Sequence, residues 1–298
     1  MGKDLAENFS VSRQVFEEVD DALGFSLSRL CFEGPAEDLQ LTENTQPAIL
    51  SVSVAAFRAV VANGFPAPAF VAGHSLGEYS ALVAAGSLSL SDAVKTVRAR
   101  GRYMQEAVPV GVGAMAAVLG AELPAIERVC ETVRGAEVCS PANINGPNQV
   151  VIAGHAAAID RAVDAMKEAG AKRVVKLNVS APFHCELMKP AQDRLAGDLE
   201  GLRFEDANIP VVTNVDAAMR QKGAELRDAL VRQVSSPVRW LESMRLLIDQ
   251  GVDTFVEVGP GKVLVGLMRQ ISREVNCFNV EDAASLQATK QNLQPVLN

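Results

Sequence analysis

Apolar residues recur at helical spacing in some segments of this chain and form short extended runs in others. Over residues 46–63 they fall on one helical face, and Gly64 follows as a stop signal. The apolar run at residues 67–72 has the length of a buried strand. Before and after these two segments, the spacing predicts further helices at residues 4–30, 76–85 and 91–107, and a short helical turn at residues 35–39.

Residues 111–180 carry a different pattern, in which short apolar runs flank two amphipathic segments. It predicts strands at 114–119, 137–144, 149–153 and 172–179, and helices at 124–133 and 156–169. Asn145-Gly146 has the residue types of a tight turn between the second and third strands. The order βαββαβ is that of a ferredoxin-like unit, so we predict a subdomain here.

The remainder of the chain returns to alternating helices and strands. It predicts strands at 209–215 and 254–258, and helices at 185–199, 224–234, 240–250 and 263–273. Such alternation favours an α/β fold with a mostly parallel sheet flanked by helices. We therefore expect one large α/β domain in two parts, residues 1–110 and 181–298, with a ferredoxin-like subdomain, residues 111–180, inserted between them.

Composition narrows the classes of protein to consider. Acidic residues outnumber basic ones by 36 to 28, giving a formal charge of −8, and there is no long basic run, so nucleic-acid binding is not expected. The five cysteines include no Cys-x-x-Cys pair, which favours reduced thiols over disulfides or a zinc site. Residues 1–10 lack the apolar core of a signal peptide, and no apolar run approaches the roughly 20 residues of a membrane-spanning helix. We expect a soluble, cytoplasmic monomer with no metal, no cofactor and no membrane association.

The most specific chemical signal is the segment 73–77, Gly-His-Ser-Leu-Gly, which has the Gly-x-Ser-x-Gly form of a nucleophile elbow. It lies between the predicted strand at 67–72 and the predicted helix at 76–85. Glycines on both sides of Ser75 allow a strained turn that exposes the hydroxyl. The first N–H groups of the helix then face the oxygen on which negative charge develops during acyl transfer. The alternative is a serine that caps a helix in an ordinary turn.

A serine hydroxyl needs a base to act as a nucleophile at neutral pH, and histidine is the usual one. The chain has three histidines. Side chains of neighbouring residues diverge at such a turn, which favours a structural role for His74. His155 follows a predicted strand, a position typical of an exposed loop residue. His184 lies where the predicted subdomain rejoins the large domain, and sites often form at such junctions, so elimination favours His184 as the base.

No carboxylate stands out as the group that orients His184. Asp193, Asp206 and Asp216 are all candidates. A backbone carbonyl or an amide also serves, because what is needed is a fixed tautomer.

The predicted helix at 91–107 carries Arg98, Arg100 and Arg102. Residues two apart on a helix project towards different faces, so Arg100 points away from the other two. An inward arginine would bind a substrate carboxylate in a fork. Three solvated arginines on an amphipathic helix are the alternative.

Five segments carry a likeness to a known family. They are residues 73–82 (GHSLGEYSAL), 100–109 (RGRYMQEAVP), 183–190 (FHCELMKP), 232–240 (RQVSSPVRW) and 255–262 (FVEVGPGK). In this order, over nearly the whole chain, they resemble the malonyl-CoA:acyl carrier protein transacylases of bacterial fatty acid synthesis. That family has a large domain with a ferredoxin-like insert, which agrees with the layout predicted above.

The resemblance implies a catalytic set. Ser75 takes the malonyl group from coenzyme A as an ester, and His184 is the general base. The carbonyl of Gln233 orients His184, and the N–H of Leu76 supplies one donor to the oxyanion. No cofactor is implied.

The resemblance also implies how the substrates are recognised. Arg100 binds the malonyl carboxylate through two hydrogen bonds. Phe183, just before the histidine, goes with a preference for malonyl over methylmalonyl, and we group His74 with the substrate-binding residues. The implied partners are malonyl-CoA or coenzyme A and the acyl carrier protein.

One departure from the family changes the expectation. The family normally begins with a strand ending in a Pro-Gly-Gln-Gly-Ser-Gln loop, whose glutamine supplies the second oxyanion donor, and this chain contains no Gly-Gln-Gly. Losing one such donor costs on the order of 10² to 10³ in rate, so we expect this chain to be weakly active or inactive unless that place is filled. Two alternatives remain: a serine thioesterase or hydrolase, and a catalytically impaired module that binds a carrier protein.

Overall fold

The structure, a computed structural model, describes residues 1–293. The α-helices, in chain order, are α1 (Lys3–Asn8), α2 (Ser10–Leu23), α3 (Leu27–Glu33), α4 (Ala36–Gln40), α5 (Thr42–Ala62), α6 (Gly77–Ala84), α7 (Leu90–Glu106), α8 (Leu123–Arg134), α9 (Ala156–Glu168), α10 (Lys189–Glu200), α11 (Gly223–Gln233), α12 (Trp240–Asp249), α13 (Val263–Ile271) and α14 (Ala283–Leu293). The strands are β1 (Val71–Ala72), β2 (Gly113–Leu119), β3 (Cys139–Gly146), β4 (Gln149–His155), β5 (Arg173–Lys176), β6 (Val211–Thr213), β7 (Ala218–Arg220), β8 (Thr254–Val258) and β9 (Asn276–Val280). A short 3-10 helix, Glu186–Met188, precedes α10.

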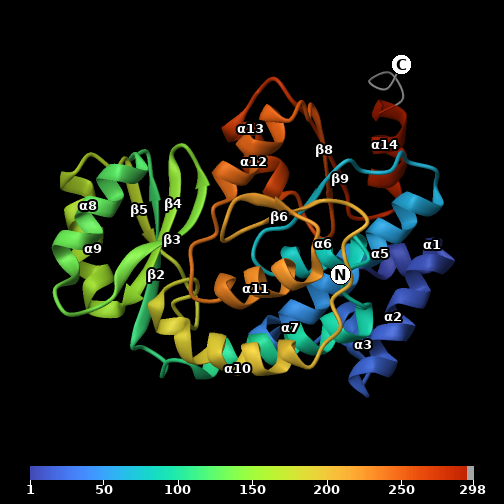
Figure 1. Ribbon diagram of the computed structural model, residues 1–298, viewed down its shortest axis with the longest axis horizontal. Coiled ribbons are helices and arrows are strands. Elements are labelled where there is room, and N and C mark those ends of the chain that lie inside the picture. Colours follow the sequence, from blue (N-terminus) through green and yellow to red (C-terminus); the bar gives the residue numbers. More distant parts are fainter. Residues whose placement is uncertain (294–298) are drawn as a thin grey trace.

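These elements form two groups in space (Figure 1). Strands β2 to β5 and helices α8 and α9, drawn in green, lie together at one end. The first and last parts of the chain, in blue and red, share the other end, although they are far apart in the sequence.

Helix α5 is the central helix of the larger group. It packs against α2, α6 and α7, and Leu50, Ala55 and Ala59 on it are fully buried. Our expectation that no apolar run reaches membrane length was wrong. Helix α5 has 21 residues and contains an 18-residue window with a mean hydropathy of 1.4, but 61% of that window is buried inside the protein, so α5 is a core helix.

The larger group contains two small sheets rather than the single, mostly parallel sheet that we expected. Strand β1 pairs parallel with β6, which pairs antiparallel with β7, and β8 pairs parallel with β9 in a separate sheet. Strand β1 is also shorter than the predicted 67–72. Pro66 and Pro68 lack the N–H that a ladder needs, and regular pairing begins only at Val71.

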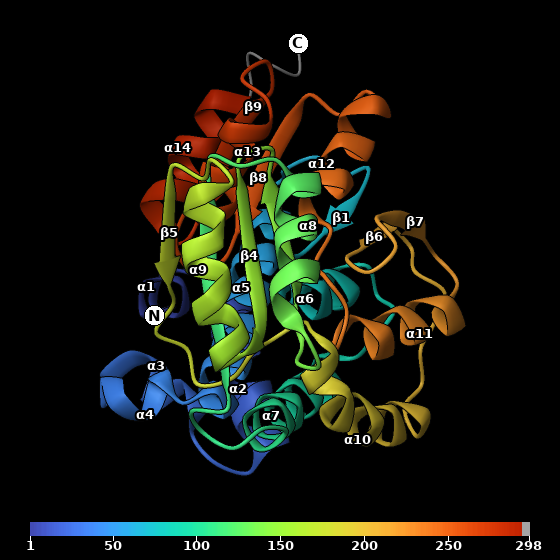
Figure 2. The same ribbon diagram turned by 90° about the vertical axis from the view of Figure 1, so that its left-hand side faces the viewer.

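The smaller group is a four-stranded antiparallel sheet in the order β3-β4-β2-β5. Helices α8 and α9 lie side by side over one face of it (Figure 2). The predicted turn at Asn145-Gly146 was wrong, because β3 continues through both residues and the connection to β4 is Pro147-Asn148. This extra length of β3 places Asn145 near the other group.

The outer edge of β3 joins the smaller sheet to the larger group. The N–H of Ile144 donates to the carbonyl of Val238, and the N–H of Val238 donates to the carbonyl of Ala142, both at 2.9 Å. The exposed edge of β3 is therefore hydrogen-bonded to the backbone of the segment just before α12.

Candidate active site

Ser75 lies on a tight turn between β1 and α6. Its φ is 51°, in the left-handed region that non-glycine residues rarely adopt. The turn brings its two ends very close, since a Cβ on Gly73 would lie 1.9 Å from the carbonyl oxygen of Gly77. A Cβ on Gly77 would meet nothing within 4 Å. The backbone packing therefore requires a glycine at 73, whereas Gly77 borders open space.

A first prediction concerns this close approach. We expect Gly73→Ala to destabilise the protein by about 1–3 kcal/mol or more and to slow sulfonylation of Ser75 by phenylmethanesulfonyl fluoride, because the turn must open to admit the methyl group. Thermal unfolding and the labelling rate measure the two effects. Gly197→Ala in α10 is the matched control, since its Cβ would meet nothing within 4 Å. A Gly73→Ala protein that labels as fast as the native one would contradict the packing argument.

His184 lies beside Ser75, although 109 residues separate them. Its Nε2 is 2.6 Å from Ser75 Oγ, and its Nδ1 is 3.0 Å from the backbone carbonyl oxygen of Gln233. A carbonyl oxygen can only accept, so Nδ1 carries the proton and Nε2 accepts the hydroxyl hydrogen of Ser75. His184 is itself left-handed, with φ of 60°, so the two residues of this pair both hold strained backbone.

The environment keeps His184 neutral. Burial, and to a smaller extent the positive charge of Arg100, lower its pKa from 6.5 to about 3. A neutral imidazole at neutral pH is the form that accepts a proton from a serine.

The pH dependence of Ser75 reactivity follows from that shift. Because a lowered pKa keeps the imidazole neutral in more acidic solution, we expect no acid limb near pH 6.5 in the rate of Ser75 sulfonylation. The measurement is the second-order rate constant from pH 8 downwards, at each pH where the fold is intact. Half-loss of reactivity near pH 6.5 would show that the imidazole is solvated and not buried as described.

Gln233 connects the residues of the site. It is fully buried at the end of α11, and its side-chain Nε2 donates to the carbonyl oxygen of Ser75 at 2.9 Å. Its side-chain Oε1 accepts from Arg100 Nη2 at 3.0 Å, while its backbone carbonyl faces His184. One residue therefore touches Ser75, His184 and Arg100.

Arg100 is a buried cation with no carboxylate partner among residues 1–293, and only 2% of it is exposed. Its guanidinium donates to three uncharged oxygens: Gln46 Oε1 at 2.7 Å, Gln233 Oε1 at 3.0 Å and Ser75 Oγ at 3.0 Å. Its Nε has no hydrogen-bond partner in the described part of the chain. A buried charge without a counter-ion is costly, so this arrangement is suited to an anionic ligand bound beside Ser75.

The remaining predicted residues lie as follows. The N–H of Leu76 makes no hydrogen bond within residues 1–293, so it is free to donate to an oxyanion. Phe183 is half-buried and packs between the cores of the two groups. His74 Nε2 is 2.8 Å from Asn145 Oδ1 on β3, and its ring lies against Trp240, so it points to the smaller sheet. That the substrate contacts His74 or Phe183 stays a prediction.

The three aspartates that we considered for orienting His184 are engaged elsewhere. Asp193 pairs with Lys189, Asp206 with Lys222, and Asp216 with Arg232. The carbonyl of Gln233 occupies the place that a carboxylate holds in many serine enzymes.

Three residues of the site escaped the sequence reasoning: Gln46, Asn214 and Glu78. Asn214 Oδ1 accepts the N–H of Ser75 at 2.6 Å, and its Nδ2 donates to the carbonyl of Gly73 at 2.7 Å, so it holds both sides of the elbow. Asn214 follows the buried strand β6, where parallel strands present ligand-binding groups. A lone glutamate in the small-residue helix α6 was the available signal for Glu78. For Gln46 the signal was its position at the start of an apolar stretch.

Comparison with known proteins agrees with this geometry. The family model of the acyl transferase domain matches residues 1–296. The malonyl CoA-acyl carrier protein transacylase of Escherichia coli (strain K12) is 48% identical over 285 residues, covering 96% of this chain and 92% of that protein. The protein of the same name from Bacillus subtilis (strain 168) is 46% identical, covering 99% and 93%.

Solved structures give the same result. The acyl carrier protein S-malonyltransferase of Vibrio cholerae superposes with a TM-score of 0.95 at 49% identity, covering 97% of this chain and 94% of that chain. A malonyl-transacylase solved in complex with a type II PKS acyl-carrier protein superposes with a TM-score of 0.94 at 48% identity, with the same coverage.

The fold and the family match together define an acyl transferase domain. More narrowly, the chain belongs to the family of malonyl-CoA:acyl carrier protein transacylases, which confirms the resemblance seen in its motifs.

Proposed function

We propose that this chain transfers a malonyl group from malonyl-CoA to the phosphopantetheine thiol of an acyl carrier protein, through an ester on Ser75. Membership of the family supports the activity. The observation that carries the choice of acyl group is the buried guanidinium of Arg100, 3.0 Å from Ser75 Oγ and without a carboxylate partner in the described structure. A malonyl group carries a free carboxylate one methylene away from its reacting carbonyl, so the carboxylate can reach this guanidinium when the carbonyl lies beside Ser75 Oγ.

In the first half-reaction Ser75 becomes acylated. His184 Nε2 takes the hydroxyl proton as Oγ attacks the thioester carbonyl, and the N–H of Leu76 donates to the oxyanion that forms. The carbon–sulfur bond then breaks, and the coenzyme A sulfur leaves with the proton from His184. The Gln233 carbonyl stabilises the imidazolium through Nδ1–H.

The second half-reaction reverses these roles. The carrier thiol gives its proton to His184 and attacks the ester carbonyl, and the departing Oγ of Ser75 recovers that proton. Arg100 holds the malonyl carboxylate in both halves, exchanging bonds to neutral oxygens for bonds to an anion.

The assignment of domains is part of this proposal. Residues 1–110 and 181–298 form the large domain that holds Ser75, Arg100 and Gln233, and residues 111–180 form a ferredoxin-like subdomain. The strand order β3-β4-β2-β5 and the two helices on one face support that division. We propose that the protein acts in the cytoplasm as a monomer.

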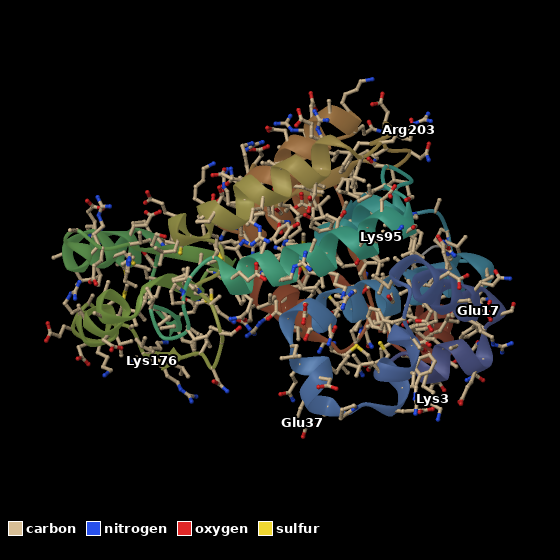
Figure 3. The ribbon with its side chains drawn as sticks, turned by 90° about the horizontal axis from the view of Figure 1, so that it is seen from below. Lys3, Glu17, Glu37, Lys95, Lys176 and Arg203 are labelled. Carbon is tan, nitrogen blue, oxygen red and sulfur yellow. The ribbon has the colours of Figure 1, made fainter. Side chains whose placement is uncertain are left out.

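The carrier protein is proposed as the partner because a relative has been solved with a carrier bound. The smaller group carries exposed cations that a carrier protein could contact. Lys176 is one of them, and its side chain projects outwards from the surface (Figure 3). Lys176 already pairs with Asp160, so its contribution to a docking surface would be small.

The test is incubation with malonyl-CoA followed by intact-mass analysis and peptide mapping. We expect one malonyl group on Ser75, discharged by the carrier thiol faster than by water. Rapid hydrolysis of the ester without transfer would indicate a thioesterase. Carrier binding with no acylation of Ser75 would indicate a binding module.

A further inference from the structure

Glu78 is a buried carboxyl group beside the site that the proposed chemistry does not use. It lies three residues after Ser75 in α6, and 1% of it is exposed. Its Oε2 accepts two hydrogen bonds, from the backbone N–H of Asn214 and from Nε2 of Gln233, both at 2.9 Å. Its Oε1 has no partner, and no basic side chain among residues 1–293 forms an ion pair with it.

Keeping a carboxyl group here is costly. Burial raises the pKa of Glu78 to about 7, against the opposing effects of its hydrogen bonds and of Arg100. An apolar side chain of similar size would pack in this small-residue helix without that cost. Compared with such an apolar side chain, Glu78 adds a hydrogen-bond acceptor for two donors, the N–H of Asn214 and Nε2 of Gln233.

Those two donors belong to the residues that hold the backbone of Ser75. Asn214 accepts the N–H of Ser75 through Oδ1, and Gln233 donates to the carbonyl of Ser75 through Nε2. Ser75 is thus held on both sides in a left-handed conformation that it would not otherwise favour. Glu78 is the group to which both holding residues are tied.

Glu78 also determines which way the Gln233 amide points. Its Oε2 accepts, as does the carbonyl oxygen of Ser75, so both require the NH2 end of the amide. The oxygen end is then left for Arg100, whose guanidinium can only donate. A flipped amide would set an NH2 group against the guanidinium.

We propose that Glu78 is a positioning residue of this site. By anchoring Asn214 and Gln233 to the helix that follows the nucleophile, it holds Ser75 in its strained conformation and turns Gln233 Oε1 towards Arg100. It touches neither substrate nor reacting atom. The inference rests on the proposed function only for the identity of the acyl group.

The test compares Glu78→Met, Glu78→Gln and Glu78→Asp. The primary readout is the rate of Ser75 sulfonylation by phenylmethanesulfonyl fluoride, which needs no acyl donor, and the second is malonyl transfer. We expect Glu78→Met to lower both rates about 10- to 100-fold, because the acceptor is gone. Glu78→Gln keeps an acceptor oxygen at the same reach and should restore both rates to within about fivefold of the native protein. Glu78→Asp is one methylene too short and should be as slow as Glu78→Met.

Glu257 provides the matched control. It is also a partly buried carboxylate that accepts two backbone N–H groups, those of Leu264 and Val265 at 3.1 and 2.7 Å. It caps α13 and, within residues 1–293, makes no hydrogen bond to Ser75, Asn214 or Gln233. Glu257→Met and Glu257→Gln should lower the melting temperature and leave the sulfonylation rate of the folded protein unchanged.

The outcomes separate the two proposals. A Glu78→Met protein that melts earlier but labels at the native rate would overturn the positioning role, as would Glu78→Gln being as slow as Glu78→Met. If Glu78→Met does not fold, the test is the comparison of Glu78→Gln with Glu78→Asp. A fast sulfonylation rate in Glu78→Asp together with a slow rate in Glu78→Gln would then overturn the positioning role. If the sulfonylation rates follow the expectation while the native protein transfers no malonyl group, the positioning role stands and the proposed function fails.

Discussion

Replacing Ser75 by alanine is expected to abolish malonylation and to lower transfer by on the order of 10⁴-fold or more, because it removes the hydroxyl that contacts both His184 Nε2 and Arg100 Nη2. The measurement is intact mass after exposure to malonyl-CoA, together with the rate of malonyl transfer to a carrier protein. If Ser75→Ala still transferred malonyl groups at a tenth of the native rate, a residue other than Ser75 would be the nucleophile.

Two variants show whether such a loss comes from chemistry or from unfolding. Ser75→Gly also lacks the hydroxyl, but glycine adopts a positive φ freely, so it should be equally inactive and about 1 kcal/mol or more stabler than Ser75→Ala. Ser80→Ala removes a buried hydroxyl from α6, the helix that follows Ser75. This hydroxyl has no hydrogen-bond partner among residues 1–293, so the variant should keep full activity.

Replacing Arg100 by alanine is expected to lower kcat/KM for malonyl-CoA by about 10²- to 10³-fold, since it removes the buried cation beside Ser75 and the hydrogen bonds that it donates. The loss with acetyl-CoA should be much smaller, because an acetyl group presents no carboxylate. The measurement is the ratio of the two kcat/KM values. Equal losses on both substrates would remove Arg100 from carboxylate binding and leave it a structural role.

Arg102→Ala is the matched control for this result. Arg102 is exposed on the same helix, two residues further along, and its guanidinium lies over the ring of Tyr103 at 5.5 Å. We expect its removal to change neither kcat/KM nor the ratio between the two substrates.

Local structure was predictable wherever the periodicity was strong. Helix α7 and the alternating elements from β2 to α9 lie within a few residues of their predicted bounds. The long predicted helix at 4–30 was wrong in detail, because Phe9 is extended and Gly24 is left-handed, which divides it into α1, α2 and α3. Such breaks depend on single backbone conformations to which hydrophobic spacing is insensitive.

The strands of the larger group were harder to predict. Strand β7 and strand β9, with the helix α14 that follows, were not predicted at all. The mostly parallel sheet is two small sheets instead. Strand pairing joins residues distant in sequence, and no local periodicity specifies which strands meet.

In the candidate site, too, some features could be predicted from local sequence and others depended on tertiary structure. The elbow around Ser75 could be recognised in the printed residues because its chemistry depends on a few adjacent positions, and the motifs sufficed to identify the family. An inward Arg100 was one of two interpretations of the predicted helix at 91–107, but the lack of a counter-ion for it among residues 1–293 could not be foreseen. Nor could the hydrogen bonds that tie Glu78 to Asn214 and Gln233. Those properties arise from side chains that are far apart in the sequence, 54 residues for Arg100 and Gln46 and 136 residues for Glu78 and Asn214. They meet only after the helices and sheets have packed, so their contacts leave no local pattern.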